Sequence, residues 1–528
     1  MNVSRRWFIG GAVSFGALGG SRIFASDGFR SGSPNLTLGV LSDIHVRCRA
    51  RPGEKISHLQ NELTFIHALE WFRDQGVDGI VLPGDMSDNG SVEFLTVVAD
   101  AWFRVFPNGR APDGRPVEQL FVYGNHDMLR AKHLRGMYKG LTDEQLKPYA
   151  ISTNPKAAWE KAFREPFSPI WTKVVKGYRF VGAQWQPFGA RGANELVNAG
   201  IADWYAAHAK EIDPSLPFFH IQHAHPKDTC YGPWAWGRDN GMTTRALSAF
   251  PNAIAVSGHS HYSLTDERSV WQGAFTSIGA GSLRCTGLTY NEFPDVGFEN
   301  GSTPGRTKDE SNAMKFSAPY ANQDGRQGML WRIYDDRIVL QRRDFLSDSD
   351  LGEDWVLPLP AAESKPFAFA ERAKKIGAPI FPEGAQLAVS RVKAKNRGAK
   401  GNEKRPAIPS EEQPCLKVVI PAAVAKDGAR AYRFDVEAKA GGKTVLKHLA
   451  AEGFDHGVTH PRAKGTTECL FALKDLPQGD VTVTVTPFNC FGRPGTPLCA
   501  RAVVGHSQPL LKNTEAGVRR RAERLLGV

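Results

Sequence analysis

The chain has 528 residues, more than one ordinary hydrophobic core holds, so two domains are expected. Its composition, with 41% hydrophobic and 23% charged residues, is that of a globular protein. The formal charge of +11 is spread along the chain, so it is compatible with anionic substrates or surfaces but does not by itself indicate nucleic-acid binding. The seven cysteines form no C-x-x-C pair, which argues against zinc-ribbon and thioredoxin-type motifs.

Residues 1–25 are predicted to be a targeting segment. The sequence SRRWFI at Ser4–Ile9 precedes a weakly apolar run rich in Gly and Ala, and it resembles a twin-arginine export signal with cleavage after Ala25. The alternative is a membrane anchor, but the run is too short and too glycine-rich to span a bilayer comfortably. Removal of this segment, which holds three arginines and no acid, leaves a charge of +8. We therefore expect an exported protein, periplasmic or extracellular, without a membrane span.

Five apolar runs are each expected to be a buried strand that ends in possible ligands. They are Leu36–Leu41 before Ser42-Asp43-Ile44-His45, Gly79–Pro83 before Gly84-Asp85, Leu120–Tyr123 before Gly124-Asn125-His126-Asp127, Phe218–Gln222 before His223-Ala224-His225, and Ile254–Ser257 before Gly258-His259-Ser260-His261. A buried strand that carries an amide, an imidazole and a carboxylate at its carboxyl end delivers them to a cleft rather than to a core. The five strand ends together predict a functional site in a cleft.

The first three of these strands are expected to belong to a β-α-β-α-β unit over residues 36–130. Leu59, Leu63, Ile66 and Leu69 recur at helical spacing between the first two strands, and Gly76 follows as a stop signal. The interval from 125 to 223 is longer than one crossover needs, so it must also hold an insertion.

Two segments near residue 335 are predicted to form a hairpin. They are 329–334 and 337–341, and they flank the turn Asp335-Asp336. We expect this hairpin to close the second sheet of the first domain, which is assigned to residues 36–350. The Pro-punctuated stretch 351–382 is assigned to a linker.

Residues 383–506 are predicted to form a second domain. Segments such as Val481–Thr486 alternate with period two and are separated by polar turns, as in a β-sandwich, and the pattern resembles a fibronectin type III-like module. The basic run Arg391–Arg405 is expected to be an exposed loop, and residues 507–528 a basic tail. Cys490 and Cys499 could be bridged in an oxidising compartment, but spacing does not decide this pairing.

In order, D-x-H, G-D, G-N-H-D, a His block and G-H-x-H resemble the motifs of the calcineurin-like metallophosphoesterases, a family of two-metal phosphate-ester hydrolases. Each block alone is weak, but all five in order, each after an apolar run, are specific. The resemblance covers about residues 36–345. It implies an α/β fold of four layers, α-β-β-α, beside the C-terminal all-β sandwich domain.

The resemblance also implies which residues hold two metals. Only a carboxylate can bridge, which selects Asp85, and the family places the bridging ligand there too. Carried over by motif position, the first metal is held by Asp43, His45, Asp85 and His261, and the second by Asp85, Asn125, His223 and His259. Mixed nitrogen and oxygen ligands suit Fe, Mn or Zn, and the sequence does not choose among them.

Two positions in these motifs remain open. His223 comes directly off its strand and is preferred as the second-metal ligand, but His225 is the alternative. The purple acid phosphatases, relatives in this superfamily, have an iron-binding Tyr three residues after the bridging Asp. Asp88 occupies that position here, so a Tyr–Fe(III) site is not supported.

His126 belongs to neither metal in the family pattern. It is expected to stabilise the phosphoryl charge or to protonate the leaving oxygen, and Asp127 is expected to fix its tautomer. The alternative for Asp127 is a carboxylate that caps a turn.

We therefore expect an exported hydrolase of a phosphate monoester or diester, acting through metal-activated hydroxide. The alternative is a non-catalytic protein that binds a cell surface or polymer and keeps a structural metal site. The expected partners are a phosphate-ester substrate and, through the C-terminal domain, the cell envelope. No nucleic acid is expected as a specific partner.

Overall fold

The structure is a computed structural model of the chain. It describes residues 32–50, 61–186, 200–232, 237–286, 325–398, 401, 406–457 and 465–505. Residues from Pro34 onward belong to one compact unit. The predicted export signal (1–25) and the predicted basic tail (507–528) lie outside the described residues and stay predictions.

A first sheet carries the strands that precede the first three motifs. Its order is β12-β11-β10-β1-β2-β3, and β13 also pairs with β11. The bounds are β1 Leu36–Val40, β2 Gly79–Pro83, β3 Glu118–Val122, β10 Gln327–Ile333, β11 Arg337–Asp344, β12 Ser349–Asp350 and β13 Trp355–Pro358. β1, β2 and β3 are parallel neighbours, joined by helices α1 (Asn61–Asp74) and α2 (Val92–Val105), which confirms the β-α-β-α-β expectation.

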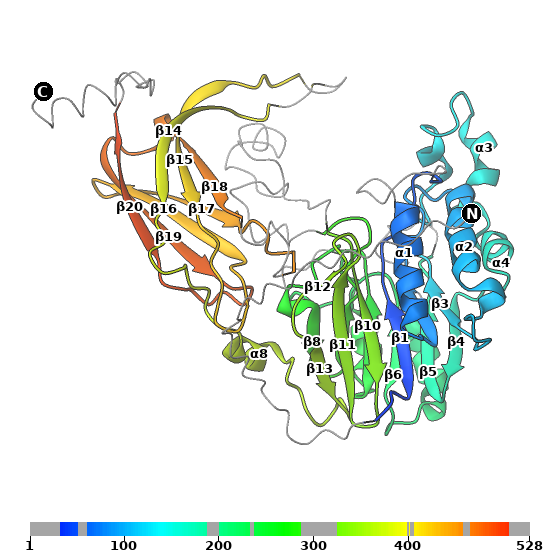
Figure 1. The fold of residues 1–528 in the computed structure, drawn as a ribbon. Helices are drawn as coiled ribbons and strands as arrows, with labels where there is room; N and C mark the ends of the chain where they lie inside the picture. The colour runs from blue at the N-terminus through cyan, green and yellow to red at the C-terminus, as the bar shows by residue number, and fades with distance from the viewer. Residues whose placement is uncertain are drawn as a thin grey trace, which may run out of the picture. The chain divides into compact units, whose positions relative to one another are not determined.

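The hairpin near residue 335 forms, but its predicted place in the second sheet is wrong. β10 pairs antiparallel with β1, with Leu36 opposite Ile333 and Val40 opposite Met329. Figure 1 shows the hairpin beside β1 in the first sheet. The physical reason is the other edge of β1, which β2 leaves uncovered. β10 covers this edge with side chains that are buried on both faces, as an internal strand requires.

A second sheet carries the strands that precede the His223 and His259 motifs. Its order is β4-β5-β6-β7-β9-β8, with β5, β6, β7 and β9 parallel to one another. The bounds are β4 Ile170–Val175, β5 Tyr178–Ala183, β6 Phe218–Ile221, β7 Ala253–Ser257, β8 Val270–Gln272 and β9 Thr276–Gly279. Residues of both sheets, such as Val81 and Val256, form one buried cluster, so the two sheets pack face to face.

Helices cover the outer face of each sheet. α1, α2 and α4 (Pro155–Phe163) pack in one cluster with residues of the first sheet, whereas α5 (Ile201–His208) and α6 (Met242–Leu247) pack with residues of the second. Together these layers form the expected α-β-β-α sandwich. The remaining helical segments are α3 Asp143–Leu146, α8 Phe369–Lys375, η1 Pro107–Gly109, η2 Ala131–Leu134, η3 Lys147–Tyr149, η4 Ile151–Thr153, η6 Ala209–Glu211, η8 Glu267–Ser269 and η11 Leu473–Asp475.

The C-terminal region forms the expected all-β sandwich. A three-stranded sheet, β14-β15-β18, and a four-stranded sheet, β17-β16-β19-β20, share one buried cluster, and every pairing is antiparallel. The bounds are β14 Ala388–Lys395, β15 Glu412–Ile420, β16 Arg433–Ala440, β17 Lys443–Ala450, β18 Thr467–Ala472, β19 Gly479–Phe488 and β20 Leu498–Val504.

Two local expectations in this region differ from the structure. The basic run 391–405 begins inside β14, because Arg391–Lys395 pairs with β15 as an edge strand whose charged side chains reach solvent. Cys490 is buried, Cys499 is exposed, and both are free thiols. The stretch 351–382 contributes β13 and α8 in addition to connecting the domains.

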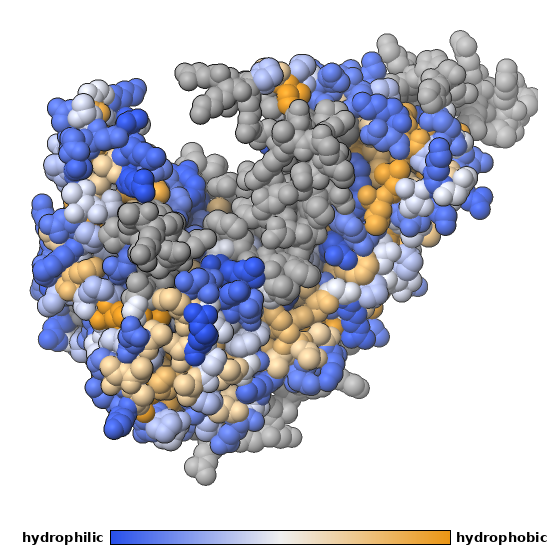
Figure 2. Space-filling view, turned by 180° about the vertical axis from the view of Figure 1, so that it is seen from behind, coloured by the Kyte–Doolittle hydropathy of each residue, from blue (hydrophilic) through white to orange (hydrophobic). Residues whose placement is uncertain are grey.

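Hydrophilic residues predominate among the coloured residues in Figure 2, and hydrophobic residues appear between them in patches. Among the described residues, none of the helices has the length and apolar character that a membrane crossing requires. The large apolar side chains are instead concentrated in the clusters between the layers.

Candidate metal centre

The five motif-bearing strand ends meet at one place in the structure. Strands β1, β2 and β3 of the first sheet and β6 and β7 of the second bring their carboxyl ends to neighbouring edges of the two sheets. Within the described residues, three groups of side chains lie close enough to share an ion. They are Asp43 with His45 and His261, His45 with Asp88 and His126, and Asp85 with His223 and His259.

The first cluster joins the beginning and the end of the motif series. His261 Nε2 lies 3.1 Å from Asp43 Oδ1 and 3.1 Å from His45 Nε2, and His45 Nε2 lies 3.6 Å from Asp43 Oδ1. Ligand atoms that share one ion, each with a bond of about 2.1 Å, are separated by roughly 3 Å. The three side chains therefore have the spacing of a ligand set, although 216 residues separate His45 from His261.

The second cluster has the same spacing. His223 Nε2 lies 2.9 Å from Asn125 Oδ1 and 3.1 Å from His259 Nδ1. The structure thus brings together the three predicted ligands of the second metal that are not shared with the first.

Asp85 lies between the two clusters. Its Oδ2 atom is 3.4 Å from His45 Nε2 on one side and 3.2 Å from His223 Nε2 on the other. Its Oδ1 atom accepts a hydrogen bond from the backbone N–H of His126 at 2.8 Å, which fixes the plane of the carboxylate. One oxygen is therefore held by the backbone while the other faces both clusters, as a bridging ligand must.

The backbone is strained at these ligands. Asp43, His45, Asp85, His259 and His261 all have positive φ, between 49° and 71°. A residue with a side chain in this region costs of order 1–3 kcal/mol and persists where the surrounding structure enforces it. Because five ligands share this conformation, the strain is a property of the site and not of one turn.

Glycines beside the ligands make room for them. A Cβ atom on Gly84, which has a φ of +95°, would lie 2.6 Å from His223 Nδ1. A Cβ on Gly124 would collide with the Asp85 carboxylate, and one on Gly258 with the Ser42 hydroxyl. The glycine of each G-D, G-N-H-D and G-H-x-H motif is thus required by close packing against a ligand or its neighbour.

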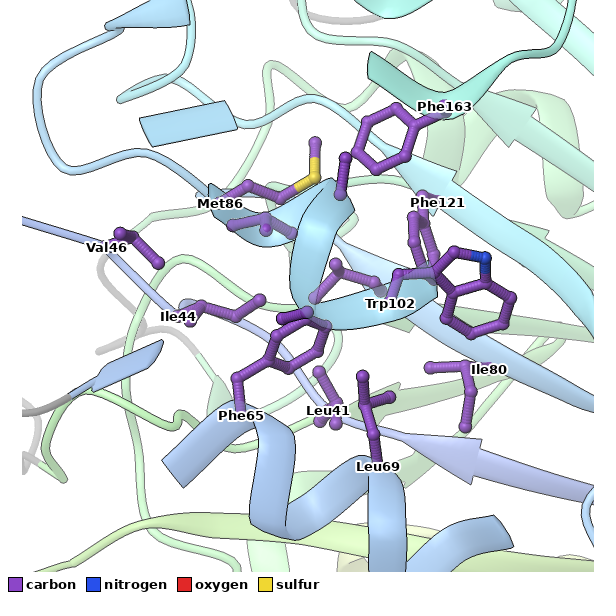
Figure 3. Packing of buried hydrophobic residues seen from close by; sticks show 14 of the residues in the cluster. Leu41, Ile44, Val46, Phe65, Leu69, Ile80, Met86, Trp102, Phe121 and Phe163 are labelled. Atoms are coloured by element: carbon purple, nitrogen blue, oxygen red, sulfur yellow. The ribbon is translucent and has the colours of Figure 1, made fainter. Parts of the chain in front are cut away.

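Residues next to the ligands anchor the turns in the core. Ile44, between Asp43 and His45, and Met86, after Asp85, are fully buried in the cluster beneath α1 and α2. Figure 3 shows both side chains within this cluster, with Ile44 beside Phe65 and Met86 on the side of Phe163. The ligand turns alternate between core-facing and site-facing residues, which ties the site geometry to the packing of the first two layers.

In three of the histidines, the ring nitrogen Nδ1 has a partner outside the two clusters. His223 Nδ1–H donates to Pro83 O at 2.6 Å, His45 Nδ1 lies 3.1 Å from Asp88 Oδ1, and His261 Nδ1 lies 3.4 Å from Cys285 Sγ. These contacts leave the Nε2 atoms facing the clusters. Such outer partners fix the ring and the tautomer of metal-ligating histidines.

The charges of the clusters suit cations. Burial opposes ionisation of Asp85, but His223 and His45 outweigh it and hold its pKa well below the usual range. Burial likewise disfavours a charged His223, yet the carboxylates of Asp85 and Asp43 raise the pKa of His223 to about 9. Carboxylates that stay ionised in a buried cluster attract positive charge, here protons and, in a loaded site, metal ions.

The donor set fits two borderline metal ions. Carboxylate, imidazole and amide oxygen or nitrogen atoms are the ligands of Fe, Mn and Zn in proteins. Among the described residues no cysteine belongs to the three groups, and Cys285 contacts His261 through the ring nitrogen Nδ1, which faces away from the first cluster. The residues present therefore fit the group that the motifs imply.

The two histidines after β6 have different surroundings. His225 is buried, and its ring nitrogens bond to Ser257 Oγ at 2.6 Å and Ser260 Oγ at 2.7 Å. Burial lowers the pKa of His225 to about 3. His223, and not His225, therefore lies in the second cluster with Asp85 and His259.

The expected pairing of Asp127 with His126 is contradicted by the structure. Asp127 is fully buried, and its oxygens accept backbone N–H bonds from Gly124 at 2.8 Å, Ser87 at 2.8 Å and Met86 at 3.3 Å. Burial, with the nearby charge of Asp85, raises the pKa of Asp127 to about 7. Asp127 is thus the turn-capping carboxylate that was the alternative reading.

Asp88 takes the role that was expected of Asp127. Its backbone carbonyl lies 2.6 Å from His126 Nδ1, and its Oδ1 atom lies 3.1 Å from His45 Nδ1. A carbonyl oxygen can only accept, so His126 carries its proton on Nδ1 and presents Nε2 as the second atom. Asp88 therefore contacts both His45 and His126.

Sequence reasoning missed several neighbours of the site. Arg47 Nε lies 3.0 Å from Asp88 Oδ2, and Arg284 Nη1 lies 3.0 Å from Asp88 Oδ1. The ring of Trp185 has its centroid 5.7 Å from those of both His223 and His259. Only Asp88 carried a signal, its position three residues after Asp85; the others come from segments without a motif.

Part of the chain matches a known protein family. Residues 36–263 match the family model described as calcineurin-like phosphoesterase. No curated protein matches the chain. The chain is similar to the solved structure of a dimetal phosphatase from Danio rerio, with 11% identity over 62% of this chain and 99% of that chain and a TM-score of 0.34. It is also similar to a purple acid phosphatase from yellow lupin seeds, with 12% identity over 62% of this chain and 55% of that chain and a TM-score of 0.35.

Proposed function

We propose that the chain is a metal-dependent phosphoric ester hydrolase that cleaves a phosphate monoester or diester outside the cytoplasm, and the match of residues 36–263 to the calcineurin-like phosphoesterase model supports the activity. The observation that carries the proposal is the position of Asp85 Oδ2, 3.4 Å from one histidine ligand and 3.2 Å from the other. One shared carboxylate between two clusters is the arrangement of a dinuclear centre.

The proposed ligands are those named from the motifs. Asp43, His45, Asp85 and His261 would hold the first metal, and Asp85, Asn125, His223 and His259 the second. Fe, Mn and Zn all suit this set. When bound, two such ions neutralise phosphoryl oxygens and acidify a water.

His126 is the proposed catalytic residue. Its Nδ1–H donates to Asp88 O at 2.6 Å, its ring centroid lies 4.5 Å from that of His45, and its side chain is 33% exposed. Nε2 can therefore reach a substrate beside the first cluster. There it would donate to a phosphoryl oxygen or give its proton to the leaving oxygen. Asp127 holds the turn that places His126 and acts at a distance from substrate.

The export route is proposed from the segment Ser4–Ile9, and the periplasm or the cell exterior is the proposed location. Replacement of Arg5 and Arg6 by Lys should then leave the protein in the cytoplasmic fraction. Processing and export of that double variant at the normal level would contradict this part of the proposal.

The C-terminal sandwich is proposed to be a fibronectin type III-like module that contacts the cell envelope. Its three-on-four strand arrangement supports the module type. Binding of the mature protein to isolated cell envelopes would test the contact, and recovery of all protein in the soluble fraction at low salt would contradict it.

The catalytic proposal is tested with the mature protein reconstituted with Mn²⁺. Hydrolysis of an aryl phosphate monoester and of the matching diester should be compared, with His126→Ala as the variant. We expect the variant to keep both metals and to lose most hydrolysis. Unchanged hydrolysis would overturn the role of His126, and two bound metals without hydrolysis of either ester by the parent protein would favour a structural site in a binding protein.

A further inference from the structure

One loop of the C-terminal sandwich contacts the catalytic domain beside the metal centre. This contact loop, residues 453–457, follows β17, and Phe454, Asp455 and His456 in it are buried. A buried carboxylate is costly unless it is hydrogen-bonded, so the partners of Asp455 show what the loop is built to hold.

The side chain of Asp455 binds the end of a segment that lines the metal centre. Its Oδ2 atom accepts a hydrogen bond from Thr286 Oγ1 at 2.5 Å, and both residues are fully buried. Thr286 ends the ligand-facing segment, which we define as Ser282–Thr286. This segment follows β9.

The ligand-facing segment contacts both sides of the first cluster. Cys285 Sγ lies 3.4 Å from His261 Nδ1, and Arg284 Nη1 lies 3.0 Å from Asp88 Oδ1 and 3.2 Å from His45 Nδ1. The segment is also tied to the backbone of the first motif, because Leu283 N–H donates to Ser42 O at 2.9 Å. Displacement of Thr286 would therefore disturb two histidine ligands of the same metal.

The backbone of the contact loop also binds the turn 263–265, which follows His261 in the chain. Thr265 Oγ1 donates to Phe454 O at 2.8 Å, and Gln327 Nε2 donates to Asp455 O at 2.6 Å. The Oε1 atom of that same Gln327 accepts from Leu264 N–H at 2.8 Å. The turn 263–265, two residues after His261, and the ligand-facing segment, whose Cys285 contacts His261 Nδ1, are thus both held by one loop of the sandwich.

The contact is closely packed as well as polar. A Cβ atom on Gly457 would lie 2.5 Å from Asp350 O, so the loop backbone lies against the edge of the first sheet with no room for a side chain. Nearby, the guanidinium of Arg268 lies 4.7 Å from the ring centroid of Tyr432. A domain that only tethers the enzyme to a surface needs no such fit around a metal ligand.

From these contacts we propose that the sandwich is part of the catalytic unit, and that Asp455 and Thr286 are positioning residues for the first metal site. Asp455 acts through Thr286 and the ligand-facing segment on His261 and His45. The catalytic consequence rests on the proposed function, whereas the effect on metal binding does not.

The test uses full-length mature protein with Thr286→Val, which removes only the hydroxyl, and with Asp455→Ala. Thr286→Ser is the conservative variant, and Asp435→Ala is the matched control, because Asp435 pairs with His448 inside the sandwich at 2.6 Å. Mn²⁺ binding is measured by calorimetric titration, with the unfolding midpoint of the metal-free protein measured beside it. Steady-state hydrolysis gives kcat and KM.

We expect Thr286→Val and Asp455→Ala to weaken one of the two Mn²⁺ sites by about tenfold or more, as loss of an outer partner of a ligand does. kcat should fall with KM nearly unchanged, Thr286→Ser should restore both, and Asp435→Ala should alter neither. Unchanged Mn²⁺ affinity in folded Thr286→Val protein would overturn the proposal, as would an equal loss in Asp435→Ala. If the parent protein hydrolyses no ester, the Mn²⁺ titration still decides the positioning role, while the proposed function alone fails.

Discussion

The strand ends of the catalytic domain and the turns of the C-terminal sandwich both contain residues with positive φ, but the residue types differ between the two regions. Around the metal centre, five residues with positive φ are aspartates or histidines that face the clusters. In the described part of the sandwich, from residue 383 onward, the positive-φ residues are all glycines, such as Gly441, Gly442 and Gly479. Glycine adopts this conformation without strain, whereas a residue with a Cβ pays of order 1–3 kcal/mol.

The difference shows where the chain gives up stability for function. The sandwich needs only to reverse direction, so glycine is sufficient in its turns. The catalytic domain must aim a ligand from the turn itself, so it keeps a side chain where the backbone disfavours one. The metal-free site is therefore expected to be strained, and metal binding should stabilise it more than it stabilises the sandwich.

The largest effect is expected from Asp85→Asn. An amide cannot bridge two ions as a carboxylate does, so one Mn²⁺ should be lost and hydrolysis should fall by about 10³-fold or more, since several kcal/mol of charge stabilisation depend on the pair. Asp435→Asn, the same chemical change inside the sandwich, is the control. Metal content by elemental analysis and kcat/KM are the measurements, and two retained metals with near-normal hydrolysis would contradict the bridging role.

His126→Ala should have the next largest effect. Loss of a positioned proton donor lowers kcat by about 10²–10⁴-fold, and both metals should stay bound because His126 lies outside the two ligand sets. The readouts are kcat and the Mn²⁺ stoichiometry of the same preparation. Loss of a metal in this variant would instead make His126 a ligand.

Glycine replacements compare the two regions directly. Gly84→Ala adds a methyl group 2.6 Å from His223 Nδ1 at a φ of +95°, whereas Gly442→Ala, at a φ of +80°, adds one into open space. Both should lose about 1–2 kcal/mol from backbone strain. Only Gly84→Ala should also weaken Mn²⁺ binding. Thermal unfolding and Mn²⁺ titration measure the two effects, and equal Mn²⁺ affinity in both variants would show that the glycine does not make room for the ligand.

A further expected effect is a pH dependence whose direction reverses when metal is bound. In the metal-free protein the pKa of His223 is raised to about 9, above its ordinary 6.5. Its protonation therefore stabilises the fold fully below about pH 6.5, and this stability is lost as pH rises through about 9. Mn²⁺ needs the neutral imidazole, so its affinity should rise about tenfold per pH unit up to the same value. Titrations between pH 7 and 9 measure this, and a flat affinity would contradict a protonated His223.

Much of the fold was predictable from local pattern. The apolar runs before Ser42, Gly84, Gly124, His223 and Gly258 became strands β1, β2, β3, β6 and β7, because a continuous apolar run of this length is stable only when buried on both faces. The sheet that receives the hairpin was not predictable, since apolar strands carry no mark of which edge they will cover. β10 would have suited either sheet by composition.

The residues of the site also differ in how far the sequence could predict them. Residues that follow a strand directly, such as Asp43, Asp85 and His259, could be placed because the strand end dictates their position. The roles of Asp88 and Asp127 could not be assigned by sequence, since Asp88 stands three residues after the ligand Asp85 and Asp127 two residues after the ligand Asn125. Only the three-dimensional path of the turns shows that Asp127 faces backbone N–H groups and Asp88 faces His45 and His126. Arg284 and Cys285 reach the centre from a segment with no motif.

The dinuclear centre bridged by Asp85 is tested most directly by anomalous diffraction from crystals of the mature protein grown with Mn²⁺. We expect two peaks about 3.5–4 Å apart on either side of Asp85 Oδ2, one against Asp43, His45 and His261 and the other against Asn125, His223 and His259. A single peak, or two peaks that do not share Asp85, would contradict the dinuclear assignment.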